Sequence, residues 1–255
     1  MIESLLGVLI SLALLIWSCD FAIKNSILVS HVYKIRPILV GIFIIAIGTS
    51  LPEFAATFQA LKLNSVGIVA GNLVGSNIAN ILLVGGIMLY PITMLVTDKK
   101  DKSTFLFFLI FSIVFFIFII FNFNIGYMYG VLLFGLLCFF IYFELKKPID
   151  ETNTISEITH SSSFFIILKI ILAFIALFFS SKYFIVYAKD LTSIFGVAET
   201  TIGITIVAFG TSLPEVIATI LSIVKKQNNL AIGNILGSNI ALSLIHISEP
   251  TRQSL

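Results

Sequence analysis

Charged side chains are scarce in this sequence, and that scarcity sets the first limit on the class of protein. Asp, Glu, Lys and Arg make up 11% of the 255 residues, whereas soluble domains carry about 25%. So little charge leaves too little polar surface to cover a water-soluble core. The net charge of +2 gives no indication of a nucleic-acid partner. Lipid is therefore the expected solvent.

Cysteine and histidine are also rare. Cys19 and Cys138 lie in apolar runs without a CxxC partner, so we interpret both as buried packing residues. The three histidines show no ligand spacing, and the motifs HExxH and GxSxG are absent. These absences argue against a soft-metal centre, a bound cofactor and an intramembrane enzyme. The sequence indicates no obligatory protein partner.

Long apolar stretches, in contrast, are numerous. Hydrophobic residues make up 58% of the chain, its mean hydropathy is +1.11, and a helix that spans a bilayer needs about 20 apolar residues. We therefore expect an all-α polytopic membrane protein surrounded by the lipid bilayer. The eight candidate spans are 2–23, 37–61, 66–90, 104–121, 127–143, 164–187, 200–224 and 230 onward.

The chain contains an internal repeat. Residues 41–79 recur without a gap as residues 203–241, with 19 of the 39 positions identical, and both copies contain GTSLPE and GSNIA. The offset is constant, since 210 − 48 = 162 and 233 − 71 = 162. This offset moves the second span onto the seventh, five spans later. Because five is odd, the two copies cross the membrane in opposite directions. We predict inverted repeats of five helices each, the second incomplete, with a substrate site near the midplane.

Lys and Arg set the expected orientation, because they collect on the cytoplasmic side. The first membrane repeat is expected over 1–143, a polar linker over 144–163 and the second repeat over 164–241. Eleven basic residues fall on the linker side and three on the other, with Arg252 set aside. The eleven are Lys24, Lys34, Arg36, Lys99, Lys100, Lys102, Lys146, Lys147, Lys169, Lys225 and Lys226, and the three are Lys62, Lys182 and Lys189. We predict a cytoplasmic linker and an external N-terminus.

Two acids lie in the middle of apolar spans. Glu53 and Glu215 occupy matching positions in the two copies of GTSLPE, and no Lys or Arg lies near either in its own span. A carboxylate at this depth costs on the order of 2.5–3.5 kcal/mol on insertion scales. Either protonation or a bound cation would remove this cost.

The neighbouring residues favour a cation. The hydroxyl residues Thr49 and Ser50 share a helical face with Glu53, and the second copy repeats this with Thr211, Ser212 and Glu215. Pro52 and Pro214 have no N–H, so the carbonyls of Gly48 and Gly210 lose their helical partners and the helices are expected to break. Hydroxyls, freed carbonyls and a carboxylate form an all-oxygen site, which suits a hard cation such as Ca²⁺.

The second motif adds polar side chains on the next span. Asn72, Ser76 and Asn80 are spaced by four, and Asn234 and Ser238 repeat the first two. The asparagines Asn72, Asn77, Asn234 and Asn239 are either ligands or interhelical hydrogen-bonding groups, and both interpretations stay open. The glycines Gly67, Gly71 and Gly75 form an adjacent stripe, which predicts that the third span packs closely against the broken second span. Gly233 and Gly237 stand beside Asn234 and Ser238 in the other copy.

GTSLPE paired with GSNIAN resembles the repeats of the calcium/cation antiporter superfamily, in particular prokaryotic sodium/calcium exchangers. The resemblance implies ten spans, a central site for Na⁺ and Ca²⁺, and antiport driven by the sodium gradient across the plasma membrane. It also implies a ligand set. This set comprises the carbonyls of Ala46 and Ala208 and the side chains of Thr49, Ser50, Glu53, Ser76, Asn80, Thr211, Ser212, Glu215 and Ser238. The residues leave open H⁺ or K⁺ as the counter-ion, and a passive cation channel.

The sequence departs from the family pattern at one place. The counterpart of Asn80 is residue 80 + 162 = 242, where the family carries Asp or Asn and this chain has Leu242. The repeat stops there, and the remaining LSLIHISEPTRQSL resembles a translated adapter sequence from DNA library preparation. We therefore expect residues 242–255 to be a non-native tail on a C-terminally truncated fragment.

The predicted orientation is testable by labelling. In a variant with Cys19→Ala and Cys138→Ala, a single Ser156→Cys in the linker should resist an impermeant thiol reagent added to intact cells, and should react after lysis. A cysteine placed at Met1 should react without lysis. Rapid labelling of the Ser156 position from outside would reverse the assigned orientation.

Overall fold

A computed structural model describes residues 1–62, 75–87, 127–146, 163–194 and 208–247, together with positions 72, 106, 110 and 113. Within these ranges every regular element is a helix, and no strand occurs. The predicted all-α class is therefore confirmed for the described part. Three predicted segments lie outside the described residues. They are the fourth span (104–121, apart from three single positions), most of the linker, and residues 248–255.

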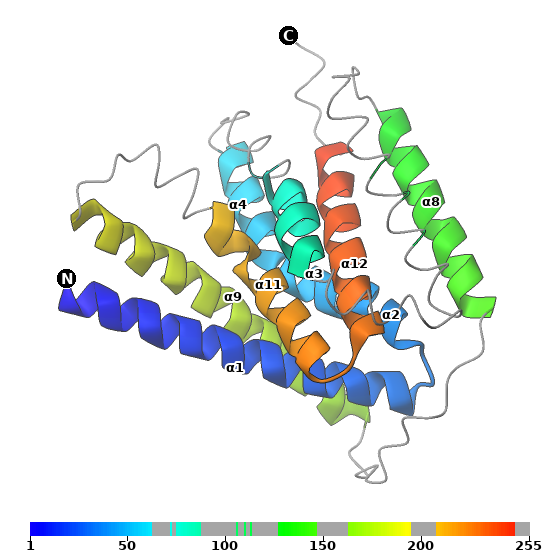
Figure 1. The fold of residues 1–255 in the computed structure, drawn as a ribbon, viewed down its shortest axis with the longest axis horizontal. Coiled ribbons are helices and arrows are strands. Elements are labelled where there is room, and N and C mark those ends of the chain that lie inside the picture. The colour runs from blue at the N-terminus through cyan, green and yellow to red at the C-terminus, as the bar shows by residue number, and fades with distance from the viewer. Residues whose placement is uncertain are drawn as a thin grey trace.

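The helices follow most of the predicted spans (Figure 1). They are α1 (Ile2–Val32), α2 (Pro37–Val40), the π-helix η1 (Gly41–Ile45), α3 (Ala46–Thr49), α4 (Leu51–Lys62), the helix Gly75–Ile87 with its π-helical part η2 (Asn80–Val84), α8 (Tyr127–Lys146), α9 (Ser163–Ile194), α11 (Ala208–Val224) and α12 (Asn228–Ile247). α1 and α9 run several residues past the predicted spans. α8 extends into the predicted linker, and α12 continues beyond Ala241.

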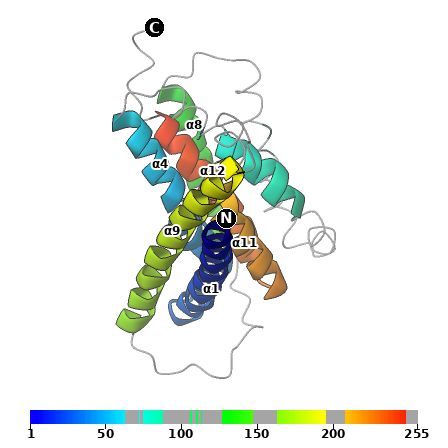
Figure 2. The ribbon, with the colours of Figure 1, turned by 90° about the vertical axis from the view of Figure 1, so that its left-hand side faces the viewer.

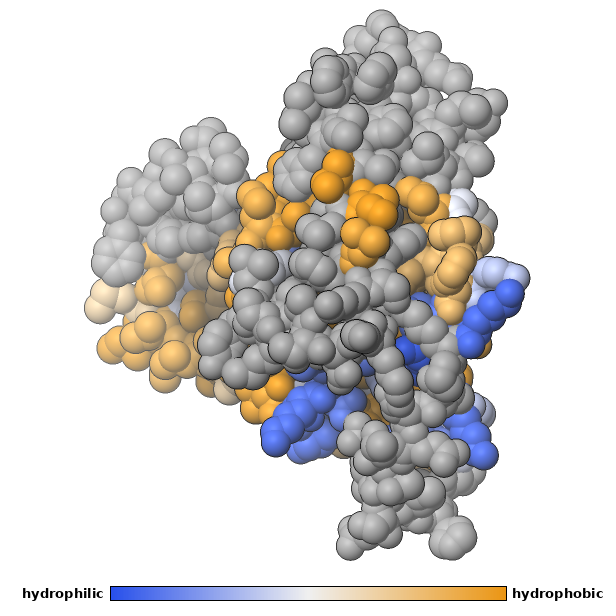
Figure 3. Space-filling model, turned by 45° about the vertical axis from the view of Figure 1, so that its right-hand side comes forward, coloured by the Kyte–Doolittle hydropathy of each residue, from blue (hydrophilic) through white to orange (hydrophobic). Residues whose placement is uncertain are grey.

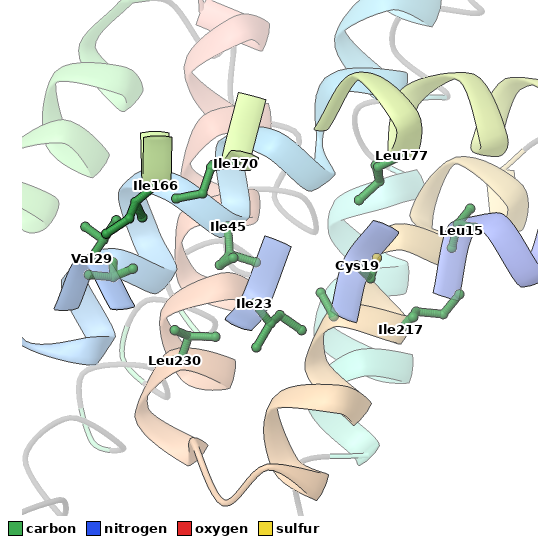
Figure 4. Close-up of a cluster of buried hydrophobic side chains, with 12 residues drawn as sticks. Leu15, Cys19, Ile23, Val29, Ile45, Ile166, Ile170, Leu177, Ile217 and Leu230 are labelled. Atoms are coloured by element: carbon green, nitrogen blue, oxygen red, sulfur yellow. The ribbon is translucent and has the colours of Figure 1, made fainter. Parts of the chain in front are cut away.

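α1 and α9 form an antiparallel pair that crosses the molecule side by side (Figures 1 and 2). Gly7, near the start of α1, meets the ring of Tyr187 near the end of α9, and Val29 near the end of α1 lies beside Ile166 at the start of α9 (Figure 4). Apolar side chains of this pair enclose Ile217 of α11 in one buried cluster. The pair therefore forms one wall of the core.

The two long helices share a local motif at the same offset as the repeat. Leu15 and Leu177 are fully buried, and 15 + 162 = 177. Ser18 donates a hydrogen bond to the Leu15 carbonyl over 3.0 Å, and Ser180 donates to the Leu177 carbonyl over 3.0 Å. The internal similarity therefore extends from the two motifs to the preceding helices.

The predicted helix break is present in the first copy of GTSLPE. Helices Pro37–Thr49 and Leu51–Gln59 meet at Ser50 with a bend of 43°. Pro52 explains the bend, because it has no N–H for the Gly48 carbonyl. In the second copy the expectation of a break is wrong, since α11 continues through Pro214. There the Gly210 carbonyl accepts a hydrogen bond from the Ser181 hydroxyl of α9 over 3.4 Å.

Glycines bring α12 against the first copy's broken helix. A Cβ on Gly233 would collide with the Ile38 carbonyl, and a Cβ on Gly41 would lie 2.9 Å from the Gly233 Cα. The glycine contact observed for α12 is thus between the two copies. In the other copy, Gly67 and Gly71 lie outside the described residues. No described atom lies within 4 Å of a Cβ added at Gly75, so the close packing against the second span predicted at that glycine is wrong.

The outer surface is largely apolar. Large hydrophobic side chains of α1 and α9 are exposed, among them Leu9, Trp17, Phe165 and Leu172, and the face in Figure 3 shows broad hydrophobic areas with hydrophilic residues toward one end. By length and composition, two described helices can cross a membrane, or three if the bent pair forms one span. Cys138 lies exposed on α8, so its predicted burial is wrong, whereas Cys19 is buried.

An ion pair fixes the end of α8 to the start of α2. The Arg36 guanidinium pairs with the Glu144 carboxylate and donates to the Glu144 carbonyl over 3.2 Å. Glu144 is buried although it stands at the first position of the predicted linker. A buried acid of this kind needs its cationic partner, because an unpaired buried charge is strongly destabilising.

The glycine contact yields a stability prediction. Gly233→Ala should lower the free energy of unfolding by about 1–3 kcal/mol, because the added methyl group overpacks the contact with Ile38. Thermal unfolding in detergent measures this. The matched control is Gly135→Ala on α8, where an added Cβ meets no atom of the described residues within 4 Å. Equal melting of Gly233→Ala and the wild type would contradict the close contact.

Candidate cation site

The two acids of the repeats lie in the interior of the helix bundle. Glu53, in the first turn of α4, and Glu215, in α11, are 0% and 1% exposed. Ser50 of the first copy donates a hydrogen bond to Glu215 Oε1 over 2.9 Å. This contact brings predicted ligands from the two copies together, as the repeat analysis expects for a central site.

The other predicted ligand residues are buried as well. Ala46, Thr49, Ser50, Ser76, Asn80, Thr211, Ser212 and Ser238 are at most 2% exposed. The hydroxyl residues Thr211 and Ser212 lie beside the Glu53 carboxylate, as Thr49 and Ser50 lie beside Glu215. Ala208 begins α11, and its side chain lies outside the described part. η2, which contains Asn80, packs against both α11 and α12.

Many of these buried polar atoms have no hydrogen-bond partner in the part of the chain that the structure describes. They are both carboxylate oxygens of Glu53, Oε2 of Glu215, the hydroxyls of Ser76, Ser212 and Ser238, and the side-chain amide of Asn80. Six of the eleven predicted ligand residues therefore carry such atoms. Buried groups of this kind are rare in folded proteins, and each costs about 1–3 kcal/mol. Coordination of a cation by the oxygens would offset that cost.

The charge of the site fits a divalent cation. Neither Glu53 nor Glu215 has a cationic partner among the described residues. Two other acids do form ion pairs: Asp20, whose carboxylate lies 2.6 Å from Lys24 Nζ and 2.7 Å from Lys225 Nζ, and Glu144, which pairs with Arg36. No three His, Cys, Asp or Glu side chains cluster in the described ranges. The donor set is thus two carboxylates with hydroxyl and amide oxygens, which suits a hard cation.

The asparagines Asn72 and Asn234 hold the acid-bearing turns. The Asn72 amide donates to the Glu53 carbonyl over 3.2 Å and to the Thr57 hydroxyl over 3.0 Å. One repeat later, the Asn234 amide donates to the Glu215 carbonyl over 3.3 Å and to Thr219 over 3.2 Å. For these two asparagines, the structure supports the hydrogen-bonding interpretation.

Sequence reasoning did not identify Thr57 and Thr219. Both are buried hydroxyl residues at identical positions of the two copies, four residues after the acid. Their recurrence in both copies was the sequence signal that could have identified them. Asn239 behaves differently from Asn234, since it donates within its own helix, to the Ile235 carbonyl over 2.9 Å.

The Ala46 carbonyl is the predicted ligand whose lone pairs are already used. It accepts hydrogen bonds from the Ser50 N–H over 3.0 Å and from the Thr49 hydroxyl over 3.2 Å. The same hydroxyl lies 3.2 Å from Asn234 Oδ1. Because a hydroxyl carries one proton, Thr49 can donate to only one of these two acceptors at a time.

α1 also reaches the site. The Cys19 thiol donates to the Pro214 carbonyl over 3.8 Å, one residue before Glu215. Leu242, the apolar counterpart of Asn80, is 0% exposed in α12. The polar lining therefore differs between the copies at that position.

The sequence is similar to those of known membrane proteins. The model of one protein family, described as sodium/calcium exchanger protein, matches residues 3–146 and 165–249. An uncharacterized membrane protein of Methanocaldococcus jannaschii is 30% identical, over 91% of this chain and 76% of its own. The sodium/calcium exchanger MaX1 of Methanosarcina acetivorans is 28% identical, over 91% and 78%.

The fold is similar to solved structures of a sodium-calcium exchanger. A structure of the sodium-calcium exchanger NCX_Mj soaked with Na⁺ and Ca²⁺ superposes with a TM-score of 0.74 at 27% identity. The match covers 96% of this chain and 80% of that one. A second structure of the same exchanger, soaked with Na⁺ and Sr²⁺, gives a TM-score of 0.74 at 28% identity.

Cation binding at this site should be measurable without transport. Ca²⁺ should raise the melting temperature of the purified protein, because a ligand at one hundred times its Kd stabilises the folded state by about 2.7 kcal/mol. Glu53→Gln should remove the Ca²⁺ effect, while Glu3→Gln, at an exposed acid of α1, should preserve it. An undiminished Ca²⁺ shift in Glu53→Gln would place the binding site elsewhere.

Proposed function

The chain belongs to the sodium/calcium exchanger family, and from that premise we propose that it exchanges Ca²⁺ for Na⁺ across the plasma membrane by alternating access. Family members are integral membrane transporters of inorganic cations, not enzymes. The observation that carries the proposal is the pair of buried carboxylates, Glu53 and Glu215. Three of their four oxygens have no hydrogen-bond partner among the described residues.

Coupling between the two ions follows from a shared set of oxygen ligands. One Ca²⁺ neutralises both carboxylates, whereas Na⁺ ions satisfy the same oxygens with single charges. The two cations therefore compete for the site, and the empty site retains two costly charges at membrane depth. An empty site is disfavoured during reorientation, so each inward step of one ion requires an outward step of the other.

Alternating access is supported by the arrangement of the two copies. α1 and α9, which share the buried Leu–Ser motif, run in opposite directions, and α4 and α11 also point in opposite directions in Figure 1. Inverted copies that exchange conformations open a midplane site first to one side and then to the other. We therefore propose inverted repeats around the eleven predicted ligand residues.

The proposed orientation has the N-terminus outside and the linker in the cytoplasm. In Figure 1 the end of α1, the end of α8, the start of α9 and the turn between α11 and α12 lie toward the same end of the molecule. Most of the basic residues counted for the cytoplasmic side belong to these segments or to their connections. The end of α4 with Lys62 lies at the opposite end.

Transport assays test the proposal directly. Membrane vesicles that contain the protein should take up ⁴⁵Ca²⁺ when loaded with Na⁺ and diluted into Na⁺-free buffer. Glu53→Gln and Glu215→Gln should each abolish this uptake, because each removes a charge that balances Ca²⁺, and Glu3→Gln should keep it. Membrane abundance of all variants is measured in parallel.

The same assay separates the alternatives. Uptake driven by a K⁺ or pH gradient without Na⁺ would identify a different counter-ion. Flux that depends only on membrane potential would indicate a passive channel. Near wild-type exchange in either glutamine variant would show that this carboxylate is not a Ca²⁺ ligand.

A further inference from the structure

Asn234 connects three parts of the cation site. Its amide group donates to the Glu215 carbonyl and the Thr219 hydroxyl of α11, and its Oδ1 accepts from Thr49 of the first copy. The side chain is 0% exposed. One buried amide thus joins α12, α11 and the broken helix α3–α4.

The position of Asn234 on its helix gives these contacts a geometric consequence. Ser238, a proposed ligand, follows four residues later, so both side chains lie on one face of α12. Because Asn234 holds the backbone of Glu215, it sets how far the Glu215 carboxylate lies from Ser238. Asn72 stands in the same relation to Glu53 and to Ser76 four residues on.

Asn234 also offers an acceptor to the Thr49 proton. A hydroxyl that coordinates a cation must present its lone pairs to the ion and direct its proton elsewhere. The Thr49 hydroxyl has two acceptors at 3.2 Å, the Ala46 carbonyl and Asn234 Oδ1. When its proton points to Asn234, the Ala46 carbonyl regains a lone pair and both oxygens become available to a cation.

We propose that Asn72 and Asn234 are positioning residues: each fixes the Glu–Ser ligand pair of its copy, and Asn234 also receives the Thr49 proton when a cation binds. Neither is a ligand. This inference rests on the proposed function, because it concerns the same site. It extends that function, because two residues that do not contact the cation fix the positions of the ligands that do.

The alternative is that the asparagines only hold the bundle together. A purely structural role lowers the stability of the ion-free protein but leaves the Ca²⁺ affinity of the folded fraction unchanged. A positioning role raises the Ca²⁺ concentration needed for half-saturation, because the ligands no longer converge in the ion-free state. The half-saturating Ca²⁺ concentration therefore distinguishes the two roles, because a loss of stability alone does not change it.

The test compares variants of Asn234 and of its partner Thr219. Asn234→Ala and Asn72→Ala should each raise the half-saturating Ca²⁺ concentration about tenfold, which corresponds to about 1.4 kcal/mol of binding free energy, with a smaller effect on maximal uptake. Thr219→Val should shift it in the same direction, and Thr219→Ser, which keeps the hydroxyl, should restore it. Ser222→Ala, one turn further along α11, removes a buried hydroxyl that has no hydrogen-bond partner among the described residues, and it serves as the control.

Two readouts keep this inference separate from the proposed function. Half-saturation is measured by Ca²⁺-dependent thermal shift and, independently, by ⁴⁵Ca²⁺ uptake. If the wild type binds Ca²⁺ but does not exchange it for Na⁺, the exchange proposal fails and the thermal shift still tests the asparagines. Unchanged half-saturation in Asn234→Ala and Thr219→Val, with only lower ion-free melting temperatures, would overturn the positioning role. Absence of any Ca²⁺ effect on the wild type would overturn both proposals.

Discussion

Two carboxylates without a cationic partner, enclosed at the centre of an apolar helix bundle, are the constraint on which the rest of the structure depends. Lipid cannot solvate them, and none of the described Lys or Arg side chains pairs with them. The acids at the ends of the bundle, Asp20 and Glu144, have such partners. Among the described residues these interior acids therefore have no cationic side chain to pair with. When both are ionised this is costly for stability, and a bound cation offsets the cost.

Two kinds of contact maintain this centre. Apolar clusters around α1, α9 and α12 supply the burial, and glycine contacts such as Gly41 with Gly233 allow backbones to approach closely. Hydrogen bonds from Asn72 and Asn234 then hold the acid-bearing turns. Packing brings the helices together, and the amides define the distances within the site.

Much of this arrangement was accessible from the sequence, because duplication makes a site visible twice. The constant offset identified Glu53 and Glu215 and their hydroxyl neighbours, and burial of both acids agrees with that analysis. Thr57, Thr219 and the cross-copy contact of Gly233 were not predicted, since they depend on which helices face each other. The outward position of Cys138 depends in the same way on the rotation of α8 about its axis. Hydropathy gives the length of a span but not that rotation.

The hexapeptide GTSLPE adopts two backbone forms in one molecule. Around Pro52 it is bent, and around Pro214 it stays helical with a serine hydroxyl on the freed carbonyl. The six residues therefore do not fix the backbone by themselves, and the packing around each copy selects its form. For α11 that packing includes the Ser181 hydroxyl of α9, and a hydrogen bond of this kind contributes on the order of 1 kcal/mol. A duplicated sequence is thus not a duplicated backbone, and the two halves of the site are asymmetric in this structure.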